Sequence, residues 1–156
     1  MMILRRRFRT GAEIALLLLA ARCGAPKDPV RATVDAMVRA ANARDAKALF
    51  DRVASGFSAA DGSGRAEARA TVERYFAAYE TLSVSIGDLR IERGADAARV
   101  RFRAAMSGRP RRIGGLDGLV PSSAAYDFDV RLSPEDGTWK VTWAGWNPAG
   151  EGGRNE

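Results

Sequence analysis

The sequence contains no histidine and only one cysteine, Cys23, among its 156 residues. Histidine is the usual general base near neutral pH and the commonest metal ligand, so its absence argues against Ser-His or Cys-His nucleophiles and against most metal sites. A single cysteine excludes both an intrachain disulfide and a thiolate metal cluster. We therefore expect no catalytic residue, no metal and no cofactor.

Strong net charge is missing from most of the chain, although the whole sequence carries +6. Five arginines and one glutamate lie in residues 1–22, which leaves a net charge of only +2 on the rest. The remaining charges alternate in sign along the chain instead of forming a basic stripe. Phosphate-backbone binding has little support from such a distribution, and we expect no nucleic-acid partner.

No apolar run is long enough for a transmembrane helix. The run from Ile14 to Ala21 is far shorter than the roughly 20 residues that a span requires. Arginines precede it and small residues follow, which is the pattern of a signal peptide covering residues 1–22. The RRRFR motif at residues 5–9 resembles a twin-arginine signal, except that Leu4 replaces the preferred Ser or Thr, and ordinary Sec export is the alternative.

Cys23 stands at the end of this apolar run, in the sequence LAARCG. The arrangement resembles a bacterial lipoprotein signal, in which the cysteine is lipidated and becomes the mature N-terminus. Arg22 departs from that pattern, and the alternatives are a cleaved soluble signal or an uncleaved anchor. In many such lipoproteins an Asp directly after the cysteine retains the protein at the inner membrane. Here that position is Gly24, so the resemblance implies a periplasm-facing protein anchored to the outer membrane. A soluble periplasmic or inner-membrane location is the alternative. Residues 23–29 would form a tether.

Three segments have helical periodicity. In residues 30–43, apolar side chains recur at i, i+4, i+7, i+8 and i+11, which predicts one apolar helix face. Asp45 is a candidate N-cap for a short second helix over residues 46–53. Residues 65–80 predict a third helix with an aromatic face. Between the second and third of these segments, the composition of SGFSAADGSG (55–64) predicts turns. Within it, Phe57 lies either in a very short strand or in a turn that its side chain anchors to the core.

From Leu82 onward the period changes to two, which predicts strands. The apolar parity flips across Gly87 and Asp88, the signature of a bulge. A strand with alternating arginines at 99, 101 and 103 follows, and then a hairpin over residues 126–146 with its turn at 133–137. Trp146 is out of phase with Trp139 and Trp143, so we expect it on the opposite side of the sheet or beyond the sheet's edge.

The predicted outer face carries two rows of opposite charge. Arg99, Arg101 and Arg103 on one strand would face Asp127 and Asp129 on the next, as exposed cross-strand pairs. Between these strands lies a long basic segment over residues 108–123. Its arginines at 109, 111 and 112 could hold a carboxylate or a phosphate, and a solvated loop is the simpler interpretation.

The element order and three segments (AANARDAKAL, RYFAAYE before the bent strand, and GTWKVTWAGW) resemble the NTF2-like superfamily. This resemblance implies an α+β fold over residues 30–146, in which three helices pack on a curved antiparallel four-stranded sheet and enclose a cone. Residues 147–156 would form a disordered tail.

The cone would bind a small apolar ligand or be filled by its own side chains. The alternative function is a protein-interaction or homodimerisation module of the cell envelope. The resemblance also includes enzymes such as ketosteroid isomerases and scytalone dehydratase, a less favoured interpretation that would need a buried carboxylate such as Asp88 or Asp35. The residues that we expect to line the cone are Tyr75, Tyr79, Phe102, Met106, Tyr126 and Trp143.

Overall fold

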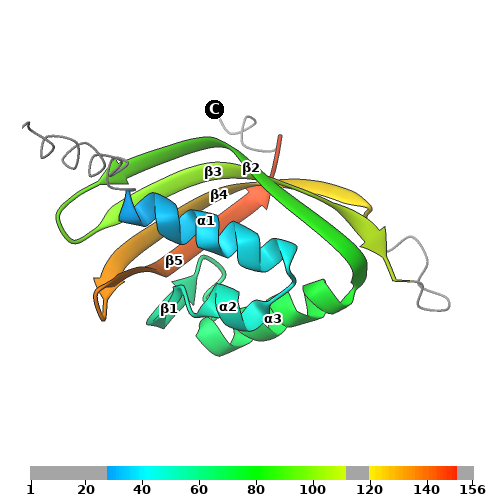
Figure 1. Cartoon of the computed structure of the whole chain (residues 1–156), viewed down its shortest axis with the longest axis horizontal. Coiled ribbons are helices and arrows are strands. Elements are labelled where there is room, and N and C mark those ends of the chain that lie inside the picture. The colour runs from blue at the N-terminus through cyan, green and yellow to red at the C-terminus, as the bar shows by residue number, and fades with distance from the viewer. Residues whose placement is uncertain (1–27, 112–119, 151–156) are drawn as a thin grey trace, which may run out of the picture.

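The computed structural model describes residues 28–111 and 120–150 (Figure 1). The predicted signal peptide, the lipidation site Cys23, the middle of the predicted long loop and the last six residues lie outside these ranges. Helices and strands follow one another as α1 (Pro29–Asn42), α2 (Ala46–Phe50), β1 (Val53–Ala59), α3 (Arg65–Ala77), β2 (Tyr79–Arg93), β3 (Ala98–Pro110), β4 (Ser123–Glu135) and β5 (Thr138–Pro148).

The sheet has five strands, in the order β1-β5-β4-β3-β2, and not the four that the sequence predicted. The additional strand is β1, which runs parallel to β5, so the sheet is mixed and not wholly antiparallel. Its one glycine and two serines suggested turns, with a very short strand at Phe57 as an alternative. Phe57 does lie in a strand, and pairing with the edge of β5 supplies the backbone partners over Val53–Ala59. The predicted α+β class and the helix-covered curved sheet are confirmed.

Helix α1 lies across the concave face of the sheet (Figure 1). It begins where predicted: Asp28 is the N-cap, its carboxylate accepts from the Val30 N–H at 2.9 Å, and Pro29 occupies the first turn. Helix α2 is capped by Asp45, as expected, but it ends at Phe50 because Val53 pairs with Val141 in the sheet.

The third helix is three residues shorter than predicted, since α3 ends at Ala77 and β2 begins at Tyr79. Tyr79 has helical spacing from Tyr75, but it pairs with Pro110 of β3. Further along β2, the predicted bulge is confirmed: the register shifts between Gly87 and Arg90, and Asp88 has a φ of 53°.

The core fills the space between α1 and the sheet. Val30 and Val34 of α1 pack against buried side chains of β3, β4 and β5, among them Val100, Leu132 and Val141. A second cluster around Phe76, Tyr79 and Leu82 lies where α3 meets β2. The helix faces predicted from periodicity are therefore those that are buried. Within the described ranges, no helix has the length and apolarity that a membrane crossing requires.

The β4–β5 hairpin turns at Asp136 and Gly137, whose φ angles of 52° and 73° are both positive. Two consecutive positive φ values are the requirement of a type I′ hairpin turn, and Asp-Gly is a preferred pair for it. Strand β5 continues to Pro148, which pairs with Tyr126, so the predicted tail begins later than Asn147.

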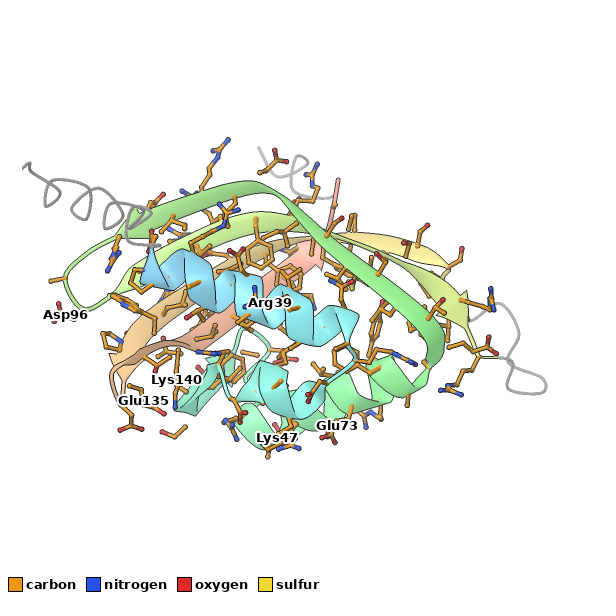
Figure 2. All side chains as sticks on the ribbon, in the orientation of Figure 1. Arg39, Lys47, Glu73, Asp96, Glu135 and Lys140 are labelled. Atoms are coloured by element: carbon orange, nitrogen blue, oxygen red, sulfur yellow. The ribbon has the colours of Figure 1, made fainter. Side chains whose placement is uncertain are left out.

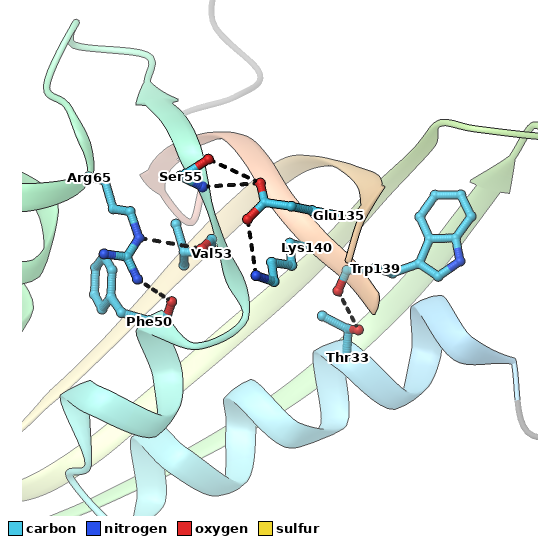
Figure 3. Close-up of polar contacts among 8 residues, drawn as sticks. All are labelled: Thr33, Phe50, Val53, Ser55, Arg65, Glu135, Trp139 and Lys140. Atoms are coloured by element: carbon cyan, nitrogen blue, oxygen red, sulfur yellow. Dashed lines mark hydrogen bonds and ion pairs between the residues drawn. The ribbon is translucent and has the colours of Figure 1, made fainter. Parts of the chain in front are cut away.

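Polar contacts join the elements at the surface (Figure 3). The Arg65 guanidinium donates to the Phe50 carbonyl at 2.8 Å and thereby links α3 to α2. The Glu135 carboxylate accepts from Ser55 of β1 and from Lys140 of β5. Figure 2 shows most labelled charged side chains projecting away from the core into solvent.

Candidate functional site

An aromatic row crosses the concave face on three adjacent strands. The rings of Phe102 (β3) and Phe128 (β4) are stacked, with centroids 5.2 Å apart and an interplanar angle of 8°. Trp146 of β5 continues the row, with its ring centroid 6.1 Å from that of Phe128. Both phenylalanines are partly buried against the core, whereas Trp146 is 43% exposed. The row is thus an apolar surface with one end open to solvent.

A bulge in β5 places Trp146 in this row. Arg131 pairs with Trp143 and Leu132 pairs with Val141, so Thr142 is an extra residue that reverses the side-chain alternation. The expectation for these two tryptophans was therefore wrong. Trp146 pairs with Phe128 on the concave side, and Trp143 lies on the outer face with the Arg131 guanidinium 4.8 Å above its ring.

All three tyrosines of the chain gather near one end of the concave face. The hydroxyls of Tyr75 and Tyr79 are 3.3 Å apart, and the Tyr79 hydroxyl donates to the Pro121 carbonyl oxygen at 2.7 Å. Burial, followed by the hydrogen bond to Tyr79, raises the pKa of Tyr75 above its usual value, and Tyr126 adds to the effect. The Tyr75 hydroxyl is therefore neutral at physiological pH.

The structure brings five of the six predicted cone residues to the concave side. Tyr75 and Met106 pack on the buried cluster that contains Tyr79. Tyr126 pairs with the buried Ala104, so it shares the inner face. Sequence reasoning missed Phe128, which has the inner parity of its strand, and Trp146, whose position depends on the bulge.

None of the six candidates lines either of two surface hollows formed by described residues. One, of about 450 Å³, lies at the β2–β3 hairpin and β4. The other, of about 340 Å³, lies between α2 and α3 and includes Arg44 and Arg111. Arg109, the other described arginine of the predicted basic loop, pairs with Glu80 at 3.6 Å. The concave candidates form a surface and do not enclose either hollow.

The carboxylates considered for catalysis face solvent. Asp35 pairs with Arg31 on the surface of α1 at 3.2 Å, and Asp88 is exposed at the bulge. On the outer face, Arg103 and Arg99 hold the pKa values of Asp127 and Asp129 below the usual range through hydrogen bonds. Within the described ranges, no group of three or more acidic, histidine or cysteine residues could hold a metal ion.

The model of one protein family, described as the SnoaL-like domain, matches residues 30–112, more than half of the chain. The chain belongs to the SnoaL-like family. The match runs from α1 through β3, so it includes Tyr75, Tyr79 and Phe102 but not the β4–β5 hairpin that carries Phe128 and Trp146. A search of the curated proteins finds no match.

Solved structures share the NTF2-like fold of this SnoaL-like domain at low sequence identity. A proposed scytalone dehydratase from Novosphingobium aromaticivorans superposes with a TM-score of 0.66 and 13% identity, covering 77% of this chain and 81% of that chain. A proposed dehydratase of the NTF2-like family from Streptomyces avermitilis has a TM-score of 0.65 and 16% identity, covering 77% of this chain and 93% of that chain. An NTF2-like protein of unknown function from Pseudomonas putida has a TM-score of 0.61 and 16% identity, covering 76% of this chain and 82% of that chain. These identities establish the fold alone.

Proposed function

We propose that this SnoaL-like domain binds a small apolar or aromatic ligand against its concave face and does not transform it. The observation that carries the proposal is the row formed by Phe102, Phe128 and Trp146, three rings side by side on neighbouring strands with an exposed end. Aromatic rings supply large contact areas and stack with ligand rings, which suits an apolar partner.

The tyrosine cluster supports binding over catalysis. Because the Tyr79 hydroxyl donates to the Pro121 carbonyl, Tyr75 is the donor in the contact between the two tyrosines. The hydrogens of both hydroxyls are therefore used inside the protein. The Tyr75 oxygen retains acceptor capacity, which suits a ligand with an N–H or O–H donor and not an oxyanion that needs a donor.

The distribution of charge also supports binding. Among the described residues no charged side chain is buried, and Thr33 is the only buried polar one apart from tyrosine and tryptophan. A general base with a raised pKa requires a carboxylate removed from water. The described carboxylates instead form surface ion pairs, cap helices or remain exposed.

Binding can be tested with N-phenyl-1-naphthylamine, a neutral fluorescent probe that is dark in water and bright against apolar surfaces. We expect a saturable increase in its emission with the wild-type chain. Phe128→Ala and Trp146→Ala should each weaken binding about tenfold, the effect of losing roughly 1.4 kcal/mol of aromatic contact.

Trp143→Ala is the matched control, because Trp143 lies three residues before Trp146 in the same strand and on the outer face. It should leave probe affinity unchanged. If the wild-type chain does not enhance the probe, or if Trp143→Ala weakens binding as much as Trp146→Ala does, the concave face is not the binding surface. Far-ultraviolet circular dichroism of each variant verifies that it has folded.

For location, we propose that the domain is exported and anchored in the outer membrane by a lipid on Cys23. The support is the sequence: one cysteine at the boundary of a short apolar run after a basic segment. Mass spectrometry of the mature protein should find a lipidated N-terminal Cys23, and Cys23→Ser should release the chain from the membrane fraction. An unmodified N-terminus at another residue would contradict the proposal.

A further inference from the structure

Two arginines stand directly opposite each other on the outer face, at the hollow of about 450 Å³. Arg99 of β3 pairs in register with Arg131 of β4, and both line the hollow. Like charges at directly opposed positions destabilise a sheet unless other groups compensate them. The way in which each charge is compensated therefore shows what the hollow can bind.

Most charges at this hollow have a partner of opposite sign. Arg99 donates to Asp129 through Nε, 2.9 Å from Oδ1, and Glu92 pairs with Arg101. Arg93, which also lines the hollow, pairs with Asp28 at 3.1 Å. Each of these pairs is neutral in sum.

Arg131 is the exception. Within the described ranges it forms no ion pair, and its contact is the Trp143 ring, 4.8 Å from the guanidinium carbon. A guanidinium stacked on an aromatic face keeps its N–H groups, which lie in its own plane, available to an oxyanion. Arg99 and Arg131 share the charge of one carboxylate, Asp129, which Arg99 hydrogen-bonds and on which Arg131 acts only through space. The hollow therefore keeps an excess positive charge at Arg131, and Ser133 also lines it.

An excess positive charge at one arginine suits a singly charged oxyanion, which is what a phosphodiester is. We propose that Arg131 and the hollow around it bind the phosphodiester of a phospholipid headgroup. Arginine recognises phosphate oxygens through paired N–H donors. The site lies on the outer face of the sheet, so it is separate from the concave aromatic row.

The beginning of the described chain supports a lipid as the source of the phosphodiester. Asp28 contacts Arg93 at the rim of the hollow, and only five residue steps separate Asp28 from Cys23. A fully extended chain of that length spans at most about 18 Å. The inference rests on the proposed lipid anchor: a chain anchored at Cys23 would hold this hollow close to the headgroups.

Vesicle co-sedimentation tests the site without the anchor. A soluble chain that begins at Gly24 contains every described helix and strand. It is mixed with vesicles of phosphatidylcholine and phosphatidylglycerol at fixed ionic strength. Arg131→Gln should weaken binding about thirtyfold or more, through loss of both charge and directed hydrogen bonds. The matched control is Arg90→Gln, because Arg90 is an exposed arginine of β2 outside the hollow. This variant should weaken vesicle binding about fivefold or less, which is the effect of losing one surface charge.

Equal losses of vesicle affinity in the two variants would show that only net charge matters and would overturn the proposed site. Absence of vesicle binding by the wild-type chain would also overturn it. A second arm adds dimethyl phosphate and follows the Arg131 side-chain signal by NMR. A response to dimethyl phosphate without vesicle binding would overturn the headgroup assignment. Because the probe chain carries no lipid, failure of the anchor is detected separately, by the mass of the mature N-terminus.

Discussion

The hydroxyl of Thr33 in α1 donates a hydrogen bond to the backbone carbonyl oxygen of Trp139 in β5, with 2.9 Å between the oxygens (Figure 3). In a regular parallel ladder, the Arg52 N–H would reach that carbonyl, but it donates instead to the Leu49 carbonyl in a turn. Thr33 therefore satisfies a backbone acceptor that the sheet leaves open, and its side chain is almost completely buried.

Replacing Thr33 with valine keeps the shape of the side chain and removes the donor. We expect Thr33→Val to lower the free energy of unfolding by about 1–3 kcal/mol, because a buried carbonyl loses its partner. Thr33→Ser, which keeps the hydroxyl, should lose less. Urea denaturation measures both, with Thr71→Val on the exposed side of α3 as the control. A Thr33→Val variant as stable as the wild type would show that water replaces the hydroxyl.

The outer-face ion pairs predict the response to acid. Hydrogen bonds from Arg103, Arg99 and Lys140 lower the pKa values of Asp127, Asp129 and Glu135, respectively. Carboxylates with lowered folded-state pKa values stabilise the protein above their unfolded pKa near 4, and the contribution is lost as pH falls through the folded values. The melting temperature should therefore fall steadily below about pH 4.

Asp127→Asn tests this assignment, because asparagine is nearly isosteric and does not titrate. Its melting temperature should depend less on pH between about 2 and 5 than that of the wild type. Asp136→Asn, which removes one carboxylate at the hairpin turn and leaves these hydrogen bonds in place, provides the control for the loss of one negative charge. Parallel profiles for all three proteins would mean that these pairs contribute nothing measurable, as is common for exposed pairs.

The contrast between β2 and β5 shows what the sequence could and could not reveal. In β2 the bulge was predictable, since the apolar parity flips at Gly87 and Asp88. In β5 the extra residue, Thr142, is an ordinary strand former in an uninterrupted alternating run. One extra residue moves every later side chain of the strand to the other face of the sheet. Trp143 therefore lies on the outer face and Trp146 on the concave face, the reverse of the expectation.

The strand β1 was only partly predictable, for a related reason. The sequence offered a very short strand at Phe57 as one of two interpretations, but Ser55, Gly56 and Ser58 have weak strand propensity. Parallel pairing with β5 extends the strand over Val53–Ala59. Helices were easier, because α1 has both a regular apolar period and a cap at Asp28. The concave candidates on β3 and β4 were also predictable, because those strands pair in register without a shift from Ala98 to Ser107.

Gly108 provides a test of how tightly the tyrosine end of the site is packed. A Cβ at this position would clash with the Thr81 carbonyl oxygen and would lie 2.8 Å from Cδ1 of Tyr79. We expect Gly108→Ala to destabilise the fold by about 1–3 kcal/mol, as overpacking does. Gly56→Ala, where a Cβ meets nothing within 4 Å, is the control and should cost far less in the same denaturation experiment.

The partly buried hydroxyl of Tyr75 predicts an unusual alkaline titration. Burial and the hydrogen bond with Tyr79 raise its pKa, so the folded state holds the Tyr75 proton more tightly than the unfolded chain does. The resulting stabilisation is complete below the unfolded pKa near 10 and is lost as pH rises through the folded value. Ultraviolet absorbance should show a late tyrosine ionisation, and Tyr75→Phe should remove it. A late ionisation that persists in Tyr75→Phe would contradict this assignment.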